Sequence, residues 1–145
     1  MGQQQLLLIV LGVIIVGIAI AVGISMFKSN AQSSNRDQVI NDLNNLAAKA
    51  QQYYRKPTAM AGGGQSFAGF GLAPVDTGNG NGSYSAHFSA APSGAAAIVG
   101  DTASNGLAPV CYIAGSGKEI GNDGVNPVKA YAIDSANSIS VKVLN

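Results

Sequence analysis

The first part of the chain is an unbroken apolar segment. Residues 6–27 read LLLIVLGVIIVGIAIAVGISMF and contain no charged side chain. At 1.5 Å per residue, a helix of this length extends about 33 Å, enough to cross a bilayer core of about 30 Å. The segment is too long for the apolar region of a signal peptide, and it lacks a basic start and a small-residue cleavage site. Residues 1–28 are therefore predicted to form a retained transmembrane helix.

A helical repeat returns after a short polar stretch. Apolar residues then recur at alternating spacings of four and three, which places them on one face of an amphipathic helix: Val39, Leu43, Leu46, Ala50 and Tyr53. Pro57 disfavours helical geometry at the residue before it, so this helix should end near Lys56. Because residues 29–35 contain neither proline nor glycine, we expect one continuous rod over residues 6–56, about 75 Å long.

The apolar stripe needs a partner, and residues 57–145 are the obvious candidate. After a glycine-rich loop at 57–82, alternating apolar positions predict short strands at 83–89, 95–99, 109–114, 128–133 and 138–144. We expect four or five antiparallel strands whose one face packs on Val39, Leu43, Leu46 and Ala50. The predicted fold class is α+β: a long N-terminal helix, with a transmembrane half and an amphipathic half at 29–56, packed on a small β-sheet head domain at 57–145.

Composition narrows the possible functions. The chain has 145 residues, of which 10% are charged, and a net charge of +1. This length suits one domain, and the charge gives no electrostatic surface for nucleic acid. With one histidine and one cysteine, the chain cannot form a Cys/His zinc site or an intramolecular disulfide. We expect no metal, no cofactor and no enzyme activity, because no set of acid, base and nucleophile can be assembled.

The residues that could suggest a catalytic, binding or modification site are expected to have structural roles. His87 is predicted to lie on the polar face of the 83–89 strand as a surface residue. Cys111 lies in the apolar stretch PVCYI, where a free cysteine behaves as a small hydrophobe. The glycines at 62–64 do not belong to a phosphate-binding motif, and the sequon at 81–83 indicates an exposed loop.

The segment MGQQQLLLIVLGVIIVGIAIAVGISMF, followed by the stripe QVINDLNNLAAKAQQYY and a small sheet, resembles a type IV pilin or pseudopilin. The resemblance implies a homopolymer whose apolar helices bundle in the filament core while the sheets form its outer shell. It also implies an inner or cytoplasmic membrane location before assembly, an extracellular filament on the cell surface afterwards, and pilus assembly machinery and a prepilin peptidase as partners. Basic residues after the helix favour a cytoplasmic head by the positive-inside rule, but the architecture carries more weight.

Two features of the family pattern are missing, the glutamate at the fifth mature position and a pair of cysteines near the C-terminus. In the family, the leader that precedes the first mature residue ends in glycine. If Gly2 is the processing site, the fifth residue is Leu7; if Met1 begins the mature chain, it is Gln5. Neither position is a carboxylate, and the three glutamines at 3–5 could supply hydrogen bonds instead, because an amide costs less to bury than a charge. Paired cysteines near the C-terminus are also absent from the sequence. The expected filament-core contacts are Gln3, Gln5, Leu7, Val13, Gly17 and Ala21.

The expected function is that of a structural subunit of a helical surface filament, for adhesion, motility or surface contact. Two alternatives stay open. A pseudopilin of a secretion machine would share the same physics in a short fibre. A single-pass, membrane-anchored binding domain would instead remain a monomer.

Overall fold

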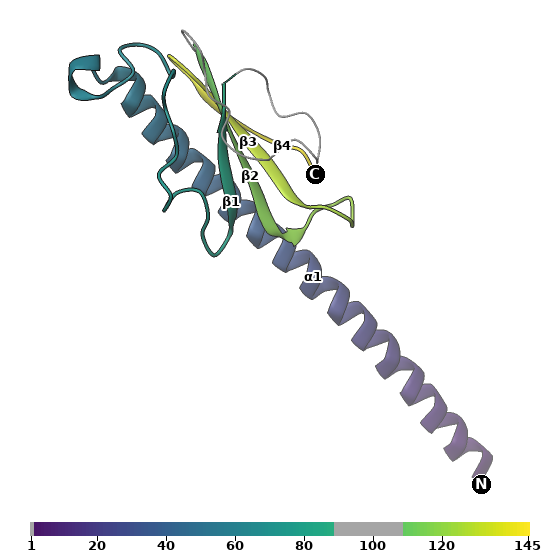
Figure 1. Cartoon of the computed structure of the whole chain (residues 1–145). Coiled ribbons are helices and arrows are strands. Elements are labelled where there is room, and N and C mark those ends of the chain that lie inside the picture. The colour runs from purple at the N-terminus through teal and green to yellow at the C-terminus, as the bar shows by residue number, and fades with distance from the viewer. Residues whose placement is uncertain (1, 89–108) are drawn as a thin grey trace.

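The computed structural model describes residues 2–88 and 109–145. Its elements, in chain order, are helix α1 (Gly2–Arg55), a 3₁₀ turn η1 (Thr58–Met60), and strands β1 (Gly82–His87), β2 (Val110–Ile120), β3 (Pro127–Ser135) and β4 (Ile139–Val143). The C-terminal half of α1 packs along one face of the sheet, while its N-terminal half projects beyond it (Figure 1). This arrangement confirms the predicted α+β class. The strand expected at 95–99 lies outside the described residues.

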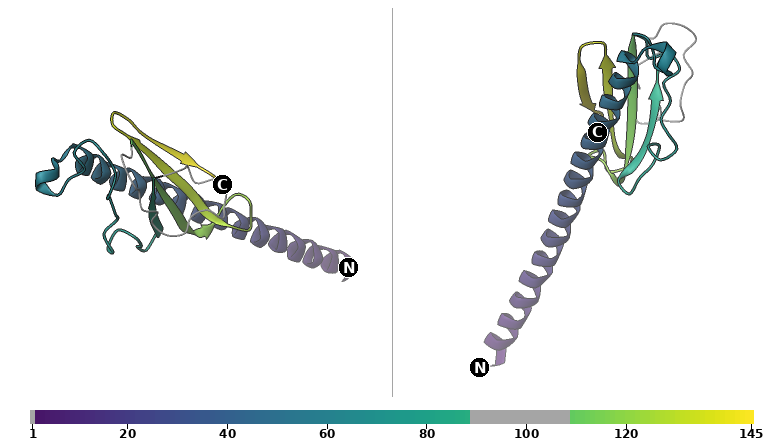
Figure 2. Two further views of the ribbon diagram at one scale, coloured as in Figure 1. Left: turned by 45° about the horizontal axis from the view of Figure 1, so that its top comes forward. Right: turned by 90° about the vertical axis from the view of Figure 1, so that its left-hand side faces the viewer.

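Helix α1 is a single rod of 54 residues, about 80 Å long (Figure 2). The polar stretch at 29–35 continues the helix, because none of its residues breaks helical geometry. The helix ends at Arg55, one residue from the predicted end and two before Pro57. The glycine-rich segment then folds back over the end of the helix, where Gly63 N–H donates to Tyr53 O at 2.8 Å and Gln65 N–H to Tyr54 O at 2.9 Å. The loop thus satisfies carbonyls that helix termini leave unpaired.

The sheet is an antiparallel meander in the order β1-β2-β3-β4. Its two central strands are longer than the pattern predicts: β2 reaches Ile120 and β3 reaches Ser135. The second half of β2 reads GSGKEI, which lacks the apolar alternation of a strand. Glycines stand there because the helix passes close by. A Cβ atom at Gly115 would lie 3.1 Å from Val39 Cγ1, and one at Gly117 would collide with the Asn35 side chain.

The core lies between α1 and the helix-facing side of the sheet. It includes large side chains from the helix, from Phe67 in the following loop and from Tyr84 and Ile113 on the strands, together with small strand residues, among them Ala86, Ala130 and Ala132. Small residues on the sheet let the helix backbone approach closely. Phe67, from the loop after the helix, closes one end of this core and contacts the Tyr54 ring at a centroid distance of 4.7 Å.

The expectation for His87, on the side of β1 opposite its apolar residues, was wrong. The sequence pattern predicts a surface position for His87, but this residue is buried, with an exposed fraction of 7%. Its Nε2 lies 2.9 Å from the hydroxyl of Ser85, which is also buried. Alternation along the described part of this strand separates apolar from polar positions correctly, but on the polar side only Ser83 is exposed, whereas Ser85 and His87 are buried. Cys111 is fully buried, as expected.

Candidate functional site: the exposed half of helix α1

The N-terminal half of α1 exposes apolar side chains on all sides. Between Leu6 and Phe27 the large apolar residues are 48% to 79% exposed. Residues 2–30 of the helix are all exposed, and the two views of Figure 2 show this half extending away from the sheet. By length and composition the helix can cross a membrane. An apolar surface of this extent in water would not be stable, so it requires lipid or another protein surface.

The six residues predicted as filament-core contacts all lie on this exposed half. Leu7 and Val13 are 69% and 67% exposed, and Gln3, Gln5 and Ala21 are exposed too. A Cβ atom added at Gly17 would meet no atom within 4 Å in the described part of the chain. None of the six belongs to the hydrophobic core cluster found among the described residues. Within the part of the chain that the structure describes, the head domain therefore leaves these six positions uncovered. Gly2, the predicted processing position, is the first residue of α1.

The four residues predicted to hold the sheet lie on the other half of the same helix. Val39, Leu43 and Ala50 are fully buried, and Leu46 is 5% exposed. They form the hydrophobic cluster together with Ile113, Ala130 and Ala132 from the sheet. The helix is therefore divided into a half that the head domain covers and a half that it leaves bare.

Asn35 marks the boundary between the two halves, and the sequence pattern did not single it out. Its side chain is buried, and its Nδ2 donates to Asn81 O at 2.9 Å. Its Oδ1 accepts hydrogen bonds from the backbone N–H groups of Lys118 at 3.2 Å and Glu119 at 3.3 Å. One amide thus ties the helix to β2 and to the loop before β1. A signal was present in the sequence, because Asn35 precedes Val39 and Leu43 at the same spacing of four.

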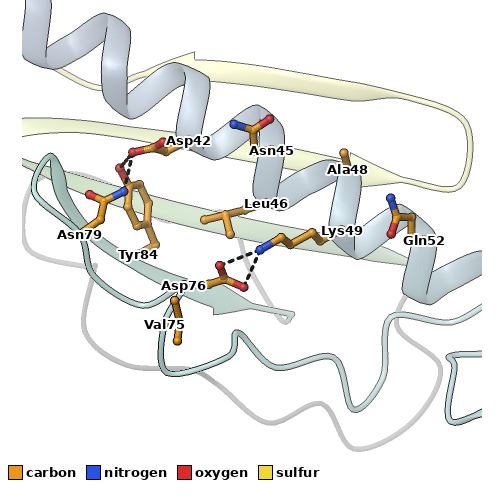
Figure 3. A pocket seen from close by; sticks show the side chains of 10 residues that line it. All are labelled: Asp42, Asn45, Leu46, Ala48, Lys49, Gln52, Val75, Asp76, Asn79 and Tyr84. Atoms are coloured by element: carbon orange, nitrogen blue, oxygen red, sulfur yellow. Dashed lines mark hydrogen bonds and ion pairs between the residues drawn. The ribbon is translucent and has the colours of Figure 1, made fainter.

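A polar hollow of about 500 Å³ lies between α1 and the loop before β1 (Figure 3). Asp42 Oδ2 accepts hydrogen bonds there from Tyr84 Oη at 2.6 Å, Asn79 Nδ2 at 2.8 Å and Asn81 Nδ2 at 3.0 Å. At its other end Lys49 Nζ lies 2.7 Å from Asp76 Oδ1. The helix thereby holds the loop at two points.

The pKa shifts of Asp42 and Tyr84 favour the hydrogen bonds that hold the loop before β1 against the helix. Partial burial acts to raise the pKa of Asp42, but hydrogen bonds from Tyr84, Asn81 and Asn79 outweigh it and lower the pKa below its usual value. Burial and the neighbouring carboxylate raise the pKa of the Tyr84 hydroxyl, which therefore stays a hydrogen-bond donor. The Asn81 amide is used by Asp42, so the sequon asparagine is engaged in the fold. These groups are matched to one another as donor and acceptor.

Asp134 is a carboxylic acid inside the core. It is fully buried on β3, opposite Cys111 of β2 and Ile139 of β4. Neither of its carboxylate oxygens has a hydrogen-bond partner of good geometry among the described residues. Burial raises the pKa of this carboxyl to about 6, and the nearby Gln51 side chain opposes the shift only in part.

Metal chemistry finds no support in the described ranges 2–88 and 109–145, where no group of three or more His, Cys, Asp or Glu side chains could hold an ion. Comparisons with protein-family models, with curated proteins and with solved structures found no match to this chain.

Proposed function

We propose that this protein is the structural subunit of a helical, type IV pilus-like filament on the cell surface, serving adhesion, motility or surface contact. The observation that carries the proposal is the division of α1. Its C-terminal half is buried on the sheet, whereas its N-terminal half is apolar and bare on every side. The bare half anchors the subunit in the membrane first and joins a bundle of identical helices afterwards.

The rigid connection between the two halves supports assembly by repetition. Asn35 and the buried stripe fix the head at one position on the rod, so each copy presents the same surfaces at the same angle. A contact between two different surfaces of identical copies repeats without closing and generates a helical array. An apolar helix leaves lipid without penalty only when other apolar helices replace the lipid.

Small residues give the bare half a surface on which helices can approach closely. Gly12, Gly17 and Gly23 leave gaps among branched side chains, and small residues are enriched where membrane helices pack. In the single chain these glycines have no packing role within the described residues, because a Cβ atom at each would meet nothing within 4 Å. A role in contacts between copies explains both properties.

Gly17→Leu separates assembly from folding and membrane insertion. The change adds apolar surface to an exposed position, so the subunit should fold and enter the membrane as before while the bundle loses a close contact. We expect filaments of the wild-type protein and none, or far fewer, of the variant, counted by negative-stain electron microscopy after detergent removal. Membrane fractionation and circular dichroism verify that the variant is inserted and folded.

A matched pair of aspartate variants tests the same surface. Val13→Asp places a charge in the middle of the predicted bundle, where an aspartate costs about 3 kcal/mol in an apolar helix. Val75→Asp makes the same change at an 85% exposed head position. The proposal requires that only Val13→Asp abolish filaments. Normal filaments from both Gly17→Leu and Val13→Asp would count against a bundle of these helices.

A further inference from the structure

The turn between β2 and β3, residues 121–126, displays two apolar side chains beside the start of the head domain. Val125 in this turn is 79% exposed, and Ile120 at its edge is 54% exposed. Neither is needed to make the turn. Asp123 Oδ1 accepts from the backbone N–H groups of Val125 at 3.1 Å and Asn126 at 2.9 Å, and Gly124 takes the left-handed conformation with φ of 71°.

The turn lies beside the helix and is hydrogen-bonded to it. Gln32 Nε2 donates to Asn122 Oδ1 at 3.0 Å, and Lys28 and Gln32 line a hollow with Ile120 and Gly124. The Asn126 side chain and backbone donate to Asp123, which holds the pKa of that carboxyl well below its usual range. Figure 1 shows the turn at the end of the sheet that faces the N-terminal half of α1. Its position along the helix is therefore fixed.

That position coincides with the surface of the membrane that would hold residues 6–27. Gln32 lies five residues beyond Phe27, or about 8 Å along the helix axis. The headgroup region on each side of a bilayer is about 5 to 8 Å thick. Ile120 and Gly124 line a hollow with Lys28 and Gln32, so the turn lies beside the helix segment that crosses the headgroup region. The exposed charges around the turn balance, because Lys28 and Lys118 are offset by Glu119 and Asp123, so the two apolar side chains would carry a contact with lipid.

We propose that the β2–β3 turn is a second membrane contact, in which Val125 and Ile120 insert into the bilayer interface beside the transmembrane helix. The contact fixes the tilt of the rod and the height of the head before assembly. This inference rests on the membrane-anchored state of the proposed function and does not depend on the filament. Its partner is the lipid interface of the same bilayer.

The absence of tryptophan from the chain provides a direct test. Val125→Trp introduces a single fluorescent reporter into the full chain, which is reconstituted in phosphatidylcholine vesicles with or without brominated acyl chains. We expect emission at shorter wavelength than in water and strong quenching by the brominated lipid. The matched control is Val75→Trp, which is equally exposed but lies near Lys49, about 33 Å beyond Phe27 along the rod. The control should emit as in water and should not be quenched.

Three results would overturn the inference, and they are distinguishable. If the chain floats with the vesicles but the Val125→Trp reporter behaves like the Val75→Trp control, the turn does not touch lipid. If the Val125→Trp emission is blue-shifted but not quenched by brominated lipid, and the shift disappears when the protein is diluted to one chain per vesicle, the turn contacts a second copy instead. If the chain does not float with vesicles at all, the membrane anchor of the proposed function fails as well. Ile120→Trp serves as a second reporter in case the substitution at Val125 disturbs the turn.

Discussion

Asp134 shows how one residue can oppose the fold that contains it. Its carboxyl is fully buried on the helix-facing side of the sheet, and burial raises its pKa to about 6. The group therefore binds its proton more tightly in the folded chain than in the unfolded one, whose pKa is near 3.8. Its contribution to stability is complete below the unfolded value, declines as the pH rises through the folded value, and is lost above it.

We predict that the free energy of unfolding falls by roughly 3 kcal/mol between about pH 4 and pH 6, because the pKa of Asp134 is raised to about 6 in the folded chain. Asp134→Asn removes the ionisable group at constant shape, so it should raise stability at pH 7 and flatten this part of the profile. Urea unfolding of the full chain in a nonionic detergent measures both effects. Asp37→Asn, at an exposed carboxylate, is the control. A loss of stability in Asp134→Asn at pH 7 would contradict the assignment.

Single residues were also where the sequence was least informative. Alternation placed His87 opposite the apolar residues of β1, but it could not show that this side of the strand is buried as well. The spacing of four places Asn35 in line with Val39 and Leu43, but the sequence does not show its hydrogen-bond partners, Asn81 and two N–H groups of β2. Periodicity identifies the side of an element, whereas solvation and partners depend on the rest of the fold.

At the scale of elements, helix α1 was predictable because its two halves have strong and different patterns. The uniform apolar run predicts a membrane helix, and the one-sided stripe predicts a packed one. The four stripe residues were identified correctly as buried positions. Strand β2 was predicted too short, because its second half uses Gly115 and Gly117 to accommodate the helix and so loses the apolar alternation of a strand.

The two halves of α1 should respond differently to the same substitution. Leu43→Ala removes a fully buried side chain from the core, so it should lower the free energy of unfolding of the head by about 2 to 5 kcal/mol. Leu8→Ala removes an equal number of atoms from a residue that is 66% exposed and should leave head stability unchanged. Chemical denaturation of both variants in detergent provides the comparison. Equal losses would show that the bare half also supports the head.

At the scale of the whole molecule, the chain is a rod with a head on one side of its C-terminal half. The head contributes almost nothing to covering residues 2–30, which are all exposed. The chain thus leaves its most apolar segment without a protein partner of its own among the described residues. Under the proposed function, this segment has two successive surroundings, the membrane and then the helices of other copies.

Cryo-electron microscopy of filaments sheared from the cell surface tests this central claim most directly. The account predicts a helical array whose density fits the side chains of this sequence, with residues 2–34 bundled near the axis and the sheets on the outside. The same density would show whether Met1 or Gln3 begins the mature chain. If no filament contains this chain and it remains in the membrane fraction as a monomer, the filament account is contradicted.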